Sequence, residues 1–152
     1  MISGEIRQDG TRVGFMLEDV ANATVGVLAH VNTRQGPRIG KYGVNLADIS
    51  RIGVTAIESA LSSADVVVID EIGPMELCSS AFVDAVRKAL CSPKPLVGTI
   101  HRSASHPMIE SIEGNPHYEI LEVTSQNRDQ VPFLVEEKLK EADKLYECFT
   151  NC

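Results

Sequence analysis

A short apolar run followed directly by two acids constrains the fold of this chain more than any other feature. Val66–Ile69 contains only β-branched residues, and Asp70 and Glu71 come immediately after it. A run of this length is too short for a helix, and its composition predicts a central parallel strand covered on both faces. Ligands of open parallel sheets bind beyond the carboxyl ends of the strands, so both acids are expected at the ligand-binding edge.

The rest of the chain alternates between strand and helix patterns. Asp9-Gly10 predicts a tight hairpin turn, and apolar residues at steps of three and four predict amphipathic helices. A stretch with glycines, a proline and three basic residues predicts a loop. The expected elements are strands over Met1–Arg7, Arg12–Glu18 and Thr24–Val31, a loop over Asn32–Gly43, a helix from Asn45 to about Ser63, the strand Val66–Ile69, a helix from Ser79 or Ser80 to about Leu90, a strand over Leu96–Ile100, a short helix near Pro107, a strand over Ile120–Val123 and a last helix from about Gln130 to Tyr146.

This order predicts an α/β domain that begins with a β-hairpin and continues as a mostly parallel sheet with flanking helices. Parallel strands need long crossover connections, and the intervening helices supply them. No repeat, low-complexity tract or linker divides the 152 residues. A single domain spanning residues 1–152 is therefore expected.

Charge and composition exclude several classes of partner. The net charge is -7 and no run of Lys or Arg is present, so nucleic acid is not expected as a partner. No apolar stretch approaches the roughly 20 residues that span a bilayer, so no membrane partner is expected. The four cysteines form no C-x-x-C pair, which favours reduced thiols in the cytoplasm. The oligomeric state does not follow from the sequence.

The acid pair suggests phosphoryl-transfer chemistry, because it matches the Walker B pattern with a second acid. In that interpretation Asp70 holds Mg²⁺, and Glu71 orients and deprotonates an attacking water. The plainer interpretation is structural, since an acid at the end of a buried strand also caps loops or pairs with a base.

Five further residues are candidates for a nucleotide site, each with a structural alternative. Arg38 and Lys41 lie in the basic loop and are candidate catalytic cations that offset transition-state charge; the alternative is a solvated loop. His101 follows a predicted strand and either contacts the terminal phosphate or is a structural histidine. Asn127 and Arg128 either contact the base of the nucleotide or form the start of the last helix.

The segment Asp70–Leu77, which reads Asp-Glu-Ile-Gly-Pro-Met-Glu-Leu, resembles the nucleoside-triphosphatases of the THEP type. Similar blocks occur in the family's order along nearly the whole chain, at Glu5–Arg7, Gly10–Phe15, Arg38–Val44, Gly98–His101 and Thr124–Asp129. The resemblance implies a P-loop fold of the RecA-like branch. It also implies Mg²⁺-dependent hydrolysis of ATP, GTP and other nucleoside triphosphates to diphosphate and phosphate.

One departure from the family pattern affects these expectations. The 152 residues contain no G-x-x-x-x-G-K-[ST] loop, which binds the triphosphate in the family. Met1 falls where the family's second strand is expected, so we expect the first strand, loop and helix to be missing through a misplaced start, a gene break or fragmentation. Two alternatives to hydrolysis follow: a catalytically inactive nucleotide-binding-fold or scaffold module, and a nucleotide kinase-like phosphotransferase.

Overall fold

The computed structural model describes residues 1–102 and 104–150. It divides into two compact units, Met1–Ser111 and Ile112–Cys152, which are described separately. The expectation of a single domain stays a prediction. Cys78 and Cys91 are free thiols, whereas the side chains of Cys148 and Cys152 lie outside the described residues.

The first unit is built on a seven-stranded sheet with the order β4-β5-β3-β2-β1-β6-β7. Neighbouring strands from β4 to β1 pair antiparallel, whereas β1 pairs with β6 and β6 with β7 in parallel. The strands, in chain order, are β1 (Ile2–Gln8), β2 (Thr11–Asp19), β3 (Thr24–His30), β4 (Arg38–Ile39), β5 (Tyr42–Val44), β6 (Val67–Ile72) and β7 (Leu96–Ile100).

The hairpin of β1 and β2 forms as its turn residues predict. Asp9 and Gly10 have positive φ angles of 49° and 74°, which is the backbone that a two-residue hairpin turn requires at both central positions. Leu17 on β2 is fully buried, so this hairpin supplies part of the core.

The expected loop over Asn32–Gly43 is wrong in its second half. Arg38–Ile39 and Tyr42–Val44 pair as a second small hairpin, β4 and β5, with Gly40 at a φ of 57° in its turn. Strands of two and three residues are too short to show an alternating apolar pattern, so the sequence did not predict this pair.

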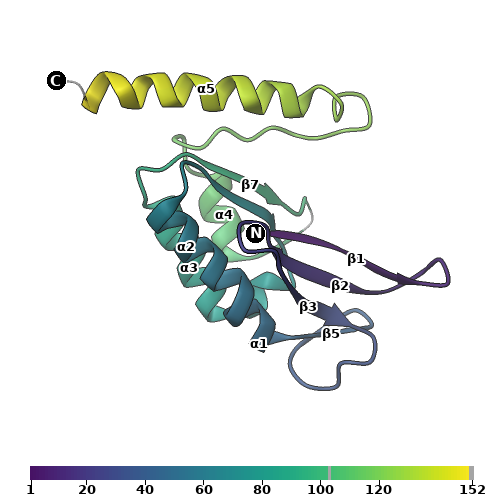
Figure 1. The fold of residues 1–152 in the computed structure, drawn as a ribbon. Coiled ribbons are helices and arrows are strands. Elements are labelled where there is room, and N and C mark those ends of the chain that lie inside the picture. Colours follow the sequence, from purple (N-terminus) through teal and green to yellow (C-terminus); the bar gives the residue numbers. More distant parts are fainter. Residues whose placement is uncertain (103, 151–152) are drawn as a thin grey trace. The chain divides into compact units, whose positions relative to one another are not determined.

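One helical stretch, coloured blue to teal in Figure 1, follows β5 and packs on the sheet. Asn45 caps it by accepting a hydrogen bond from the Asp48 amide at 3.3 Å. Its middle is a π-helical segment in which a Cβ on Gly53 would lie 3.3 Å from Leu17, so the helix approaches the sheet closely there. The stretch consists of α1 (Leu46–Asp48), η1 (Ile49–Val54) and α2 (Thr55–Ser63).

A second helix, α3 (Ser80–Leu90), lies beside α2 (Figure 1). Ser79 caps it, as the sequence predicts, by accepting a hydrogen bond from the Phe82 amide at 3.3 Å. Phe82 is fully buried and lies under the π-helical segment near Gly53. Both helices therefore contribute to one core against the sheet.

The strand that carries the acids is longer and less covered than predicted. β6 runs through Asp70 and Glu71 to Ile72 instead of ending before them. Its burial alternates, and Val68 is 40% exposed, so the expected cover on both faces is wrong for the described structure. Alternating burial means that one face of this strand packs on the core while the other meets solvent.

The C-terminal unit contains α5 (Val131–Thr150), and α4 (Pro107–Glu113) spans the boundary between the units. The expected strand over Ile120–Val123 is wrong: no described strand pairs with this segment, and Ile120 and Val123 are 48% and 59% exposed. A segment of β-branched residues forms a strand only when a neighbouring strand provides backbone hydrogen-bond partners. Among the described helices, none is both long and apolar enough to cross a membrane.

Candidate active site

Asp70 stands on β6 with its side chain open to solvent and held from the neighbouring strand. The Thr99 hydroxyl on β7 donates a hydrogen bond to Asp70 Oδ1 at 2.5 Å. The Asp70 amide donates to the Met1 carbonyl oxygen at 3.1 Å. Asp70 is thus fixed by its backbone on one side and by one carboxylate oxygen on the other, while Oδ2 accepts no hydrogen bond from the described residues.

Glu71 follows Asp70 through a cis peptide bond and is half-buried. Burial raises the pKa of the Glu71 carboxyl above its ordinary value, His101 acts in the opposite direction, and Asp70 adds to the rise. His101 therefore acts electrostatically on Glu71. Its contact with the terminal phosphate stays a prediction. An acid with a raised pKa beside an open edge is suited to accepting a proton.

A third acid, Glu76, lies close to the acid pair, and no role for it follows from the sequence. It begins the short 3₁₀ turn η2 (Glu76–Cys78) and is only 1% exposed. Burial raises its pKa to about 7, and the charges of Glu71 and Asp70 add to this rise. Acids are common near the start of helices, where they interact favourably with the helix dipole. The residue type of Glu76 therefore does not mark it as functional.

Thr99 is the other residue of the site without a predicted role. It lies in β7, which pairs in register with β6 through Ile69 opposite Gly98. Thr99 is the next residue after Gly98, as Asp70 is the next after Ile69, and its hydroxyl donates to the Asp70 carboxylate. The signal was present in the sequence as a polar residue inside the otherwise apolar run of Leu96–Ile100.

The acid pair fits a magnesium ion better than a metal with a full set of protein ligands. The described residues contain no group of three or more His, Cys, Asp or Glu side chains placed to hold a metal. Magnesium commonly binds one or two carboxylates and takes its other ligands from water and substrate phosphates. Asp70, with one oxygen held by Thr99 and the other open, satisfies that requirement.

The structure does not bring Arg38 and Lys41 to the acids. They belong to the hairpin of β4 and β5, and β1, β2 and β3 lie between that hairpin and β6 in the sheet. Arg38 Nη2 donates to the Lys41 carbonyl oxygen at 2.6 Å, and Lys41 Nζ lies 5.4 Å from the centre of the Tyr42 ring. Their catalytic role stays a prediction.

Asn127 and Arg128 belong to the C-terminal unit and form its turn before α5. Asn127 Oδ1 accepts from the Thr124 amide at 2.7 Å, and Asn127 Nδ2 donates to the Glu122 carbonyl oxygen at 2.8 Å. The Asn127 side chain thus shapes the preceding turn. Arg128 is exposed and pairs loosely with Asp129 at 3.7 Å. Contact of Asn127 and Arg128 with a base stays a prediction.

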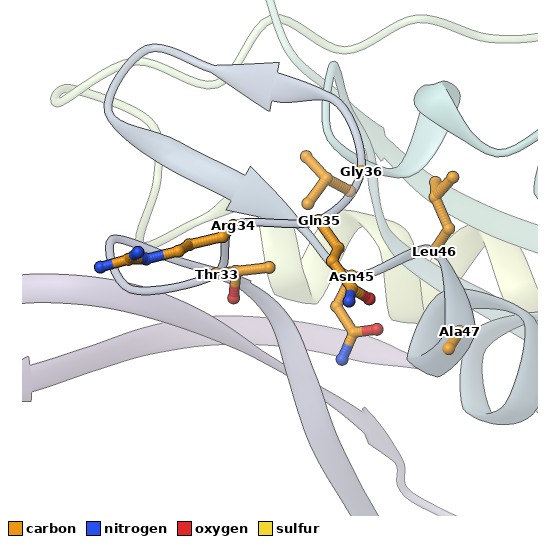
Figure 2. A pocket seen from close by; sticks show the side chains of 8 residues that line it. Thr33, Arg34, Gln35, Gly36, Asn45, Leu46 and Ala47 are labelled. Carbon is orange, nitrogen blue, oxygen red and sulfur yellow. The ribbon is translucent and has the colours of Figure 1, made fainter.

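An open pocket of about 540 Å³ lies elsewhere in the first unit (Figure 2). Figure 2 shows Thr33 and Arg34 on the loop before β4, and Leu46 and Ala47 on the helix opposite. None of its lining residues belongs to β6 or β7. This pocket is separate from the acid pair.

Comparison with known proteins decides the family. A family model described as NTPase matches residues 1–135. The nucleoside-triphosphatase THEP1 of Methanosarcina acetivorans is 47% identical over 130 residues, which cover 86% of this chain and 72% of the relative. THEP1 of Thermofilum pendens is 47% identical over 133 residues, covering 87% and 73%. The chain belongs to the THEP1 nucleoside-triphosphatase family.

A solved structure of a family member supports the fold. The crystal structure of THEP1 from the hyperthermophile Aquifex aeolicus matches with a TM-score of 0.82 at 28% identity, covering 91% of this chain and 81% of that one. The predicted α/β fold of the P-loop type with flanking helices is confirmed. Membership of the THEP1 family makes nucleoside-triphosphatase activity the expected enzyme class.

Proposed function

We propose that this chain contributes the metal-binding and water-activating side of a cytoplasmic, Mg²⁺-dependent nucleoside-triphosphatase. The substrates are ATP, GTP and other nucleoside triphosphates, and the products are the diphosphate and phosphate. The observation that carries the proposal is the acid pair at the end of β6, with Asp70 held by Thr99 and Glu71 half-buried beside it.

Each acid has a distinct task in this proposal. Asp70 would hold Mg²⁺ through its carboxylate, and the bound ion would supply positive charge against the phosphates. Glu71 accepts a proton from the attacking water as the water adds to the terminal phosphorus and the bond to the diphosphate breaks. Partial burial suits Glu71 to this task, because it raises the carboxylate's affinity for a proton.

An inactive nucleotide-binding or scaffold module is the competing function, and a specific observation favours it. The 152 residues contain no G-x-x-x-x-G-K-[ST] loop to hold the triphosphate. The retained pair of Asp70 and Glu71, with Thr99 placed to hold one of them, favours the enzyme. A kinase would need a pocket beside the acids for a second substrate that accepts the phosphate, and the pocket in Figure 2 does not lie there.

Phosphate release from ATP and GTP tests the proposal. The assay uses the protein as its gene encodes it, with any in-frame sequence before Met1, with and without Mg²⁺. The enzyme proposal expects Mg²⁺-dependent release of one phosphate per triphosphate. Nucleotide binding without release would instead support the inactive module.

A further inference from the structure

Glu76 is a buried carboxyl that the proposed chemistry leaves unused. It is 1% exposed, and neither Oε1 nor Oε2 has a hydrogen-bond partner among the described residues. The backbone amides of Gly73 and Glu76 point toward the carboxyl and favour its charged form, but neither reaches hydrogen-bond geometry. A buried polar group without a partner costs free energy, so its retention calls for a reason.

The geometry around Gly73 brings this carboxyl to the proposed base. A Cβ on Gly73 would lie 2.8 Å from Glu71 Oε1 and 3.0 Å from Glu76 Oε2. Both carboxyls therefore line the space that the missing side chain of Gly73 leaves open. The two acids reach this space from different elements, Glu71 from β6 and Glu76 from η2.

The charges around Glu76 favour its neutral form. In addition to burial, the negative charges of Glu71 and Asp70 on β6 raise the pKa of Glu76. Burial raises the pKa of the Cys78 thiol, and Glu76 raises it further. None of the charges from described residues that act on Glu76 is positive. Burial without a cation makes the ionised form costly, which agrees with the raised pKa of about 7. A neutral carboxyl is a hydrogen-bond donor, and Glu71 Oε1 is an acceptor in the same space.

We propose that Glu76 is a positioning residue for Glu71: its neutral carboxyl donates a hydrogen bond to Glu71 and holds that side chain toward the attacking water. This inference rests on the proposed function of Glu71 as the base. A hydrogen bond that removes the rotational freedom of a base acts on the rate of the chemical step and leaves substrate binding unchanged.

Two substitutions at the same position separate positioning from packing. Glu76→Gln keeps the shape and a donor, so kcat should stay within about threefold of the original. Glu76→Leu removes the donor, and kcat should fall about tenfold to a hundredfold at an unchanged KM, as loss of a hydrogen bond to a charged group predicts. Equal kcat in Glu76→Leu and the original, or equal damage in both variants, would overturn the proposal.

Two controls keep this result interpretable. Glu58→Gln alters an acid that is exposed on α2 and paired with Lys88, and should leave kcat and KM unchanged. Circular dichroism on each variant shows whether it folds. Gly73→Ala is an independent variant, since its Cβ would displace both carboxyls and should lower kcat as Glu76→Leu does.

Carboxyl ¹³C NMR on the 152-residue chain tests the contact without turnover. Near pH 6, about one unit below its pKa, Glu76 should give the signal of a neutral carboxyl. The Glu71 signal should move in Glu76→Leu and stay near its original position in Glu76→Gln. An ionised Glu76, or a Glu71 signal that ignores both substitutions, would refute the inference. If no form of the protein releases phosphate, the proposed function fails, and the NMR result still decides the contact.

Discussion

The antiparallel and parallel parts of the sheet are built in different ways. The strands from β4 to β1 pair antiparallel with one another, and Leu17, Leu28 and Val44 are buried at 2% exposure or less. In the parallel part, β6 alternates between buried and exposed residues, and β7 has no fully buried residue. Both parts supply core residues, since Val67, Ile69 and Ile72 of β6 are also buried, but the parallel part in addition presents the polar side chains of Asp70 and Thr99 to solvent. Substitutions should therefore separate stability from activity.

Glu71→Gln should give the largest effect, and it should be on activity. Removing a general base lowers the rate by about 10² to 10⁴. Nucleotide binding and melting temperature should change little, because Glu71 is only half-buried. Phosphate release under saturating Mg²⁺ and ATP measures the loss. Turnover equal to the original would remove Glu71 from the mechanism.

Leu17→Ala should show the opposite behaviour, with the loss on stability. Leu17 is fully buried on β2 and packs against the helix at Gly53. Truncation of a buried leucine costs about 3 kcal/mol of unfolding free energy. Urea denaturation measures this, with Val25→Ala, at an exposed position of β3, as the matched control. A cost below about 1 kcal/mol would mean that the hairpin is not part of the core.

Glu76→Gln should change how stability depends on pH. The pKa of Glu76 is about 7 in the folded chain against an ordinary 4.5, so the folded state binds the proton more tightly. The stability linked to that proton is complete below pH 4.5 and is lost as pH rises through about 7, a difference of about 3 kcal/mol. The glutamine variant should lack this slope when melting temperature is followed against pH. Parallel curves for the two proteins would contradict the assigned pKa.

Thr99→Val should weaken Mg²⁺ binding while leaving the fold intact. The substitution removes the hydroxyl that donates to Asp70 Oδ1. Loss of a group that orients a metal ligand typically costs about tenfold or more in apparent metal affinity. The Mg²⁺ dependence of phosphate release measures the change, and Thr99→Ser, which keeps the hydroxyl, is the control. Unchanged Mg²⁺ dependence in the valine variant would separate Thr99 from the metal site.

Val68→Thr should give the smallest effect. Val68 is 40% exposed on the strand that carries the acids. Substitution at a partly exposed position with a residue of the same shape changes stability by about 0.5 kcal/mol or less. A loss near that of Leu17→Ala, measured by the same urea denaturation, would show that this face is covered and would erase the contrast between the two parts of the sheet.

Local signals predicted the elements of this chain well. Asp9-Gly10 correctly predicted the first hairpin turn, and Ser79 correctly predicted the start of α3. The apolar run correctly predicted the position of β6. Each of these signals acts within a few residues, where backbone preference and capping decide the outcome.

Features that depend on distant partners were not predictable in the same way. Ile120–Val123 has the composition of a strand but no partner among the described residues. Thr99 reaches Asp70, and Glu76 reaches the space beside Glu71, only because strand register and a turn bring them there. A single sequence shows residue types but not these registers.

The hydrogen bond between the Asp70 amide and the Met1 carbonyl oxygen has a consequence for tuning the enzyme. This bond joins the Asp70 backbone to the residue that precedes β1, so the position of Asp70 depends on the hairpin more directly than on the helices. Small shifts of that hairpin should move Asp70 before any shift in α3 does. Selection for altered catalysis should therefore recover substitutions on β1 and β2 as well as at the acids themselves.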